Sequence, residues 1–108
     1  MHLMRDLRWS PAEKKIARRA YEAALDRALA KTMAAFKAKA AAAATPSDMW
    51  DVEDYLRRER REIDRTFDYR YSQLLFVFTL LIHEGHLEEA ELSGLSEEKI
   101  DIVRRNLP

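Results

Sequence analysis

The sequence predicts an all-α protein with two long helices, a small C-terminal head of two or three helices, and antiparallel pairing of two copies in a homodimer. Three observations support this fold class. The 108 residues include only two glycines and three prolines, so the turn chemistry of an all-β fold is scarce. Helix start signals recur at Ser10, Thr45 and Ser96. Apolar residues between them follow the helical period.

The chain is short enough to form a single domain, residues 1–108, with long helices at about 11–44 and 46–68 and the head at about 69–108. The formal net charge is +0, but residues 1–45 carry ten Lys/Arg against four Asp/Glu, and residues 46–108 carry nine against fifteen. The two halves should attract each other, within or between chains. No cysteine is present, and the longest apolar run is far too short for a membrane span. We expect a cytoplasmic protein that does not bind membranes.

The first long helix should begin at a capping box, Ser10-Pro11-Ala12-Glu13, with proline at the first helical position. No glycine or proline interrupts the chain from there to residue 44. One apolar stripe repeats at helical spacing and predicts a buried face: Tyr21, Leu25, Leu29, Met33, Phe36, Ala40 and Ala43.

The second long helix should begin almost at once, because Thr45-Pro46-Ser47-Asp48 repeats the start signal with Thr45 or Ser47 as the cap. Its apolar stripe is formed by Met49, Val52, Leu56, Ile63, Phe67 and Leu74. The sequence does not decide whether residues 46–84 form one helix or two with a bend near residues 68–71.

Arg60 projects onto the edge of this stripe. A guanidinium keeps its charge, so if it is desolvated it needs a carboxylate. Glu53 and Asp64 are the candidates on the same helix, and Asp54 of a second chain is another.

The head should contain a helix that is apolar nearly all round, residues 74–82, followed by a stop at Gly85. A single short helix at 87–92 should end at Gly94, and Ser96 should cap the last helix. Whether Phe76 and Phe78 are core residues or include an exposed docking aromatic stays open at this point.

Helices of this length leave apolar stripes that the short C-terminal segments of one copy cannot cover. A two-fold homodimer is the economical way to bury them. We assign Met49, Val52, Leu56 and Ile63 to the dimer interface.

Trp50, Asp54 and the arginines at 57, 58, 60 and 61 form either a partner-binding patch or a solvated helix face. In the second case Glu53–Arg57 and Asp54–Arg58 are ordinary pairs at i, i+4 spacing. A tryptophan off the main stripe favours an interface.

His83 and His86 are three residues apart, whereas the helical zinc motif needs two histidines four apart, and the only other histidine is His2. We therefore expect no metal and no cofactor. No nucleophile–base pattern or phosphate-binding glycine loop is present, so we expect no enzyme. The lysines of the first helix lack interleaved stacking aromatics, so we expect no nucleic-acid binding.

The segment WDVEDYL…RREID…FDYRYSQLLFVFTLLIHEG, followed by LEEAELSGLSEEKI, resembles the fluorescence recovery protein family of cyanobacteria and its relatives outside them. The resemblance covers most of the chain from about Thr45 onward, and the first helix matches only in character. It implies an all-helical homodimer. It also implies a non-enzymatic regulator that binds the photoactivated, red form of the orange carotenoid protein, hastens its return to the resting orange form and ends quenching at the phycobilisome.

By position, the resemblance assigns Trp50, Asp54 and Arg60 to a partner-binding or dimer-shaping patch and Phe76 to a partner contact in the head. Glu53 stands where the family pattern has a histidine, which adds a negative charge beside Asp54. The alternative function is a helical dimeric adaptor of the same fold with a different native partner.

Overall fold

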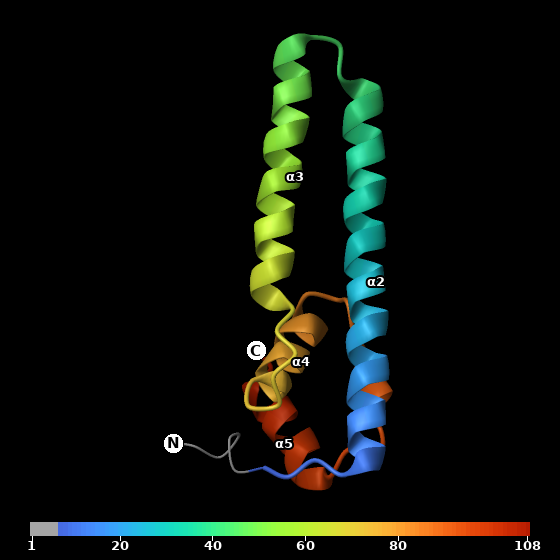
Figure 1. Cartoon of the computed structure of the whole chain (residues 1–108), viewed down its shortest axis with the longest axis vertical. Helices are drawn as coiled ribbons and strands as arrows, with labels where there is room; N and C mark the ends of the chain where they lie inside the picture. The colour runs from blue at the N-terminus through green and yellow to red at the C-terminus, as the bar shows by residue number, and fades with distance from the viewer. Residues whose placement is uncertain (1–6) are drawn as a thin grey trace.

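The computed structural model describes residues 7–108. Its elements are α2 (Pro11–Ala42), α3 (Pro46–Thr66), α4 (Leu74–His83), the 3₁₀-helix η1 (Glu89–Leu92) and α5 (Glu97–Asn106). Helices α2 and α3 form a long antiparallel hairpin, and the three shorter elements gather at its base (Figure 1). The principal extents are 53 × 26 × 25 Å. The predicted all-α fold with two long helices and a small head is confirmed.

Both long helices begin at capping boxes. Ser10 Oγ accepts from the Glu13 amide at 3.1 Å, and Thr45 and Asp48 make the reciprocal pair at the start of α3. The Asp48 carboxylate also accepts from the Ala44 amide at 2.9 Å. This bond and the proline at position 46 hold the preceding backbone extended, so α2 ends at Ala42, before the expected residue 44.

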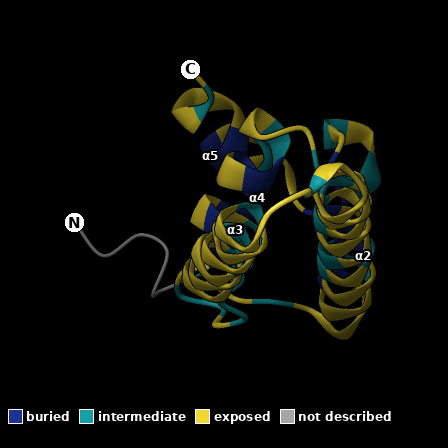
Figure 2. Cartoon of the chain, turned by 90° about the horizontal axis from the view of Figure 1, so that it is seen from above, coloured by how far each residue is buried: buried dark blue, intermediate teal, exposed yellow. Residues whose placement is uncertain are grey.

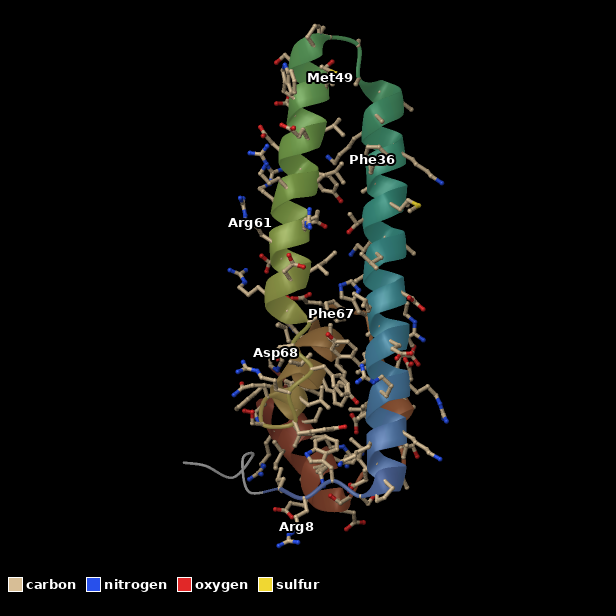
Figure 3. The ribbon with its side chains drawn as sticks, in the orientation of Figure 1. Arg8, Phe36, Met49, Arg61, Phe67 and Asp68 are labelled. Carbon is tan, nitrogen blue, oxygen red and sulfur yellow. The ribbon has the colours of Figure 1, made fainter. Side chains whose placement is uncertain are left out.

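The segment after Thr66 is an extended link, so residues 46–84 form two helices. Alternate side chains of an extended chain point the same way, and this brings Phe67, Tyr69 and Tyr71 to one side. Ring centroids of Tyr21 in α2 lie 5.4 Å from Phe67 and 4.8 Å from Tyr69, both edge-to-face. Figure 3 shows Phe67 turned toward α2.

A continued helix would rotate these alternate positions by about 200° each and break the shared contact with α2. Tertiary packing therefore ends α3 at Thr66, before the expected residue 68. Leu74, expected in the stripe of the second long helix, belongs instead to α4 and is fully buried in the head.

The core lies in the head and along the N-terminal part of α2. Figure 2 shows the buried segments of α4 and α5 in dark blue. Leu74, Phe78 and Leu81 of α4 are completely buried, and α5 contributes Ile102 and Val103. The buried face of α2 consists of small residues at helical spacing: Ala17, Ala20, Ala24 and Ala28. Alanines let the head and α3 approach the α2 backbone closely.

The apolar stripe predicted for the first helix is not the face that this chain buries. Tyr21 and Leu25 are half-buried, whereas Leu29, Met33 and Phe36 are 46%, 57% and 36% exposed. The stripe lies about a third of a turn from the alanine face by helical geometry. One chain therefore leaves these large side chains uncovered.

The head follows the predicted stop and start signals. Gly85 has φ +82°, and the amides of Gly85 and His86 donate to the carbonyls of Ile82 and Leu81, which completes a Schellman cap on α4. Ser96 Oγ accepts from the Lys99 amide at 3.3 Å and caps α5. These caps end α4 and begin α5, and the two helices pack against each other.

A buried ion pair fastens α5 to the start of α2. Lys99 Nζ lies 3.2 Å from the Glu13 carboxylate, and the two side chains are 4% and 11% exposed. Glu13 also accepts from the Ser96 amide at 2.9 Å. Burial alone raises the pKa of Glu13, but the hydrogen bonds from Ser10, Ser96 and Lys99 outweigh burial and lower that pKa.

Candidate protein-interaction surfaces

The start of α3 presents the predicted patch to solvent. Trp50 is 57% exposed. Glu53 forms the expected pair with Arg57 at 3.3 Å. Asp54 and Arg60 are exposed, and within residues 7–108 neither has an oppositely charged group within 4.0 Å. Of the two pairs that a solvated helix face would make, Glu53–Arg57 is therefore formed and Asp54–Arg58 is not. Arg60 is solvated in the single chain and needs no carboxylate there.

The patch occupies the outer half of α3. The α3 residues that face α2 are identified by their contacts: Glu59 receives a 3.4 Å hydrogen bond from Thr32, and the Tyr55 ring lies 4.8 Å from Lys39 Nζ. Trp50 and Asp54 lie roughly opposite these positions on the helix. Figure 3 shows Arg61, on the same outer side, projecting away from α2.

A second surface is apolar and belongs to both long helices. On α2 it is the stripe of Leu29, Met33 and Phe36. On α3 it includes Met49, which is 52% exposed, and the half-buried Leu56. In each helix these residues lie roughly a quarter turn beyond the residues that face the partner helix.

The two apolar stripes share one side of the hairpin, which follows from the helix directions. In both helices the stripe is rotated about the helix axis in the same sense, starting from the residues that face the other long helix. Because α2 and α3 are antiparallel, equal rotations in opposite chain directions point to the same side of the plane that contains the two helices. We call this surface the apolar face; Arg60 lies at its edge by the same geometry.

The remaining residues of the expected dimer interface, Val52 and Ile63, are half-buried. Ile63 and Thr32 line one cavity between the long helices. Of the four residues assigned to the interface, Met49 is therefore the one most available to a second chain.

The head carries a third surface on α4. Phe78 is completely buried, whereas Phe76 is 51% and Leu80 40% exposed. These two are one helical turn apart, so they form a continuous apolar spot, with the exposed His83 on the same side. The structure thus resolves the open question about the two phenylalanines, and Leu80 is a neighbour that the sequence did not single out.

The Trp50 patch and the Phe76 spot are not brought together within one chain. Trp50 lies in the first turns of α3, at the far end of the hairpin, and α4 lies in the head (Figure 1). The rise along α3 from residue 50 to residue 66 is about 24 Å.

Part of the predicted attraction between the basic first half and the acidic second half is satisfied inside the chain. Arg27 of α2 lies 2.6 Å from Glu91 of η1 and donates to the His86 carbonyl at 3.1 Å. The hydrogen bond from Arg27 is the main cause of the lowered pKa of Glu91. This contact ties the loop after α4 to the long helix.

Two expected absences concern metals and membranes. Among residues 7–108, no group of three or more His, Cys, Asp or Glu side chains is arranged to hold a metal ion. His2 lies outside the described residues. Over the same residues, no helix is long and apolar enough to cross a membrane.

Known proteins are similar to this chain in both sequence and structure. The chain is 35% identical over 91 residues, 84% of each protein, to the curated fluorescence recovery protein of Synechocystis sp. strain PCC 6803. The structure matches the Fremyella diplosiphon fluorescence recovery protein with a TM-score of 0.87 at 33% identity, covering 91% of this chain and 96% of that one. The solved structure of the Synechocystis protein matches with the same TM-score, identity and coverage.

The similarity extends over nearly the whole chain, including the first long helix. Residues 9–105 match the family model described as photoprotection regulator fluorescence recovery protein. The match therefore covers the hairpin and the head together, and the surfaces described above belong to one conserved fold. This chain is a member of the fluorescence recovery protein family of photoprotection regulators.

Proposed function

We propose that this protein is a homodimeric, non-enzymatic regulator that binds the photoactivated orange carotenoid protein and accelerates its return to the resting orange form, which ends quenching at the phycobilisome. Membership of the photoprotection regulator family supports this function. The observation that carries it is the exposed Trp50 on a face of α3 that the rest of the chain leaves open. Large exposed aromatics beside arginines are typical of protein interfaces.

The apolar face supports the dimer. Leu29, Met33, Phe36 and Met49 are each more than a third exposed in the single chain. A continuous surface of large apolar side chains from two helices is typical of an interaction site rather than of a free surface. A second copy is the proposed occupant, with Met49, Val52, Leu56 and Ile63 as α3's share of the interface.

Arg60 provides the polar edge of that interface. Its charge persists when a second chain covers the apolar face, so it then needs a carboxylate. Asp54 of the second chain is the proposed partner. In an antiparallel dimer the start of one α3 also approaches the head of the other copy, so Trp50 of one protomer and Phe76 of its partner face the carotenoid protein from one end of the dimer.

Acceleration of the red-to-orange return requires differential affinity. A protein that bound the open, compact and transition states equally would leave their populations and the barrier between them unchanged. We propose that the surface formed by Trp50 of one protomer and Phe76 of its partner binds the two separated domains of the photoactivated carotenoid protein. It binds their compact arrangement more tightly than the separated one.

Binding of the photoactivated form tests this proposal. A mixture with illuminated orange carotenoid protein is followed by size-exclusion chromatography with light scattering, and titrated to give a dissociation constant. Trp50→Ala and Phe76→Ala should each weaken binding by tenfold or more, which corresponds to about 1.4 kcal/mol. Lys37→Ala, an exposed change on α2 outside these surfaces, is the matched control and should have no effect.

If the folded dimer fails to bind the illuminated carotenoid protein, the alternative is supported: an adaptor of the same fold with a different native partner. If binding occurs but none of these substitutions weakens it, the family function stands and the surface is misassigned.

A further inference from the structure

A basic groove lies beside the aromatic link, at the lower end of α2. It is lined by Lys14, Lys15, Arg18, Arg19 and Glu22 of α2, with Tyr69 and Tyr71 of the link. It is shallow and open to solvent, with a volume of about 490 Å³. Four cations and one carboxylate therefore face one groove, on a chain whose formal net charge is +0.

The positive charge of this groove is poorly compensated. The only ion pair that its lining cations make with described residues joins Arg18 to Glu22 at 3.9 Å, with both side chains more than half exposed. Such an exposed pair is weak. Lys14, Lys15 and Arg19 are exposed and have no carboxylate within 4.0 Å among residues 7–108. The groove is thus a local positive field open to a ligand.

The two tyrosines give the groove a rigid floor. The Arg18 guanidinium carbon lies 3.7 Å from the centroid of the Tyr69 ring, and Lys14 Nζ lies 5.4 Å from that of Tyr71. Tyr71 is itself held at 5.6 Å from Tyr69 and 5.3 Å from Trp9. A guanidinium stacked on a ring keeps its N–H edges free and loses little freedom when it binds a carboxylate.

The surroundings select a short ligand. The Glu22 carboxylate lines one end of the groove, about two turns of α2 beyond Lys14. A long polyanion or a flat anionic membrane laid along the groove would also meet this carboxylate. A short acidic segment can contact the four cations without extending as far as Glu22.

We propose that this groove binds a short acidic segment of a partner protein, with Lys15, Arg18 and Arg19 pairing with Asp or Glu side chains. This surface is separate from the Trp50 patch and the Phe76 spot. The proposal for the groove does not require that the partner be the carotenoid protein. Its test is therefore independent of the proposed function.

The test uses the whole protein and a fluorescein-labelled peptide of six alternating Asp and Glu residues, with binding followed by fluorescence anisotropy. The peptide should bind in 20 mM salt and lose about tenfold in affinity at 200 mM, because the Debye length falls below about 10 Å. Lys15→Glu combined with Arg19→Glu should weaken binding tenfold or more. Both side chains are exposed and have no ion-pair partner among residues 7–108, so the fold should survive, which circular dichroism checks.

The matched control is Lys31→Glu combined with Lys37→Glu, which makes the same charge change on the same helix outside the groove. Compared in 100 mM salt, it should retain binding to within about twofold, since charges further away than a Debye length of about 10 Å are largely screened. Equal loss in both double variants would overturn the proposal, because it would mean attraction to overall charge. A twelve-nucleotide single strand of DNA, or vesicles containing an anionic lipid, should bind more weakly than the peptide; tighter groove-dependent binding of either would also overturn it.

Discussion

The buried ion pair between Glu13 and Lys99 should be among the most sensitive points of the fold. Glu13→Gln keeps the side-chain volume but leaves the Lys99 ammonium, 4% exposed, without a carboxylate. Removing one member of a buried pair costs about 3–5 kcal/mol. Lys99 keeps the Arg8 carbonyl at 2.6 Å and the Trp9 ring at 4.9 Å, so we expect a cost at or just below the lower end of that range, about 2–3 kcal/mol.

A double-mutant cycle separates the pair from its surroundings. Lys99→Met should cost about 1–2 kcal/mol, because Glu13 keeps its hydrogen bonds from the Ser10 and Ser96 amides. The double variant Glu13→Gln/Lys99→Met should be no less stable than Glu13→Gln alone, since both charges have been removed from the buried site.

The pH dependence has a definite sign. The pKa of Glu13 is lowered in the fold from its ordinary 4.5, so the folded state favours the ionised carboxylate. Its contribution is fully present above pH 4.5 and is lost as the pH falls through the lower, folded value. The stability difference between wild type and Glu13→Gln should therefore shrink on acidification.

Urea unfolding followed by circular dichroism at pH 7 and below pH 4 measures these differences. Protein concentration is held fixed, because association also stabilises the folded state. A loss below about 0.5 kcal/mol for Glu13→Gln at pH 7, or a difference that does not change with pH, would refute the role given to this pair.

Two further predictions concern the head and the dimer. Gly94→Ala should destabilise the fold by about 1–3 kcal/mol, since φ is +105° and a Cβ would lie 2.5 Å from Ile16 Cδ1. Gly85→Ala, at φ +82° with nothing within 4 Å, should cost only about 1 kcal/mol, and equal shifts in thermal unfolding would contradict this. Met33→Glu and Met49→Glu, which place a charge on the apolar face, should each raise the dimer dissociation constant at least tenfold. Light scattering across a dilution series measures this, and unchanged dimers would place the interface elsewhere.

The helix starts and the end of α4 were the most predictable features of this fold because they depend on neighbouring residues. The cap residues Ser10, Thr45 and Ser96 and the stop at Gly85 all act within four residues of the helix end that they set. The break after Thr66 depends instead on Tyr21, which is distant in sequence and packs against the link. No local pattern contains that contact.

The buried face of α2 escaped prediction for a related reason. Helical periodicity gives most weight to large apolar side chains, so it selected the stripe that includes Met33 and Phe36. Close approach of the head and α3 instead requires small residues, and Ala20 and Ala24 supply them. The large stripe remains available to a second chain.

Among surface residues, the exposure of Trp50 was predictable because Trp50 lies off the apolar stripe of its helix. Phe76 and Phe78 were not separable by sequence, since the run around them is apolar on every side, and only packing against α5 and α2 decides which is buried. The basic groove was missed because its aromatic floor, Tyr69 and Tyr71, comes from the link and not from the helix that carries the cations.

The most direct test of the central claim is the dark recovery of orange carotenoid protein, followed by absorbance after illumination, with and without this protein. The proposed function predicts a faster red-to-orange return that is largely lost with Trp50→Ala or Arg60→Leu and retained with the control Lys37→Ala. An unchanged recovery rate, with the protein shown to be folded and dimeric, would contradict it.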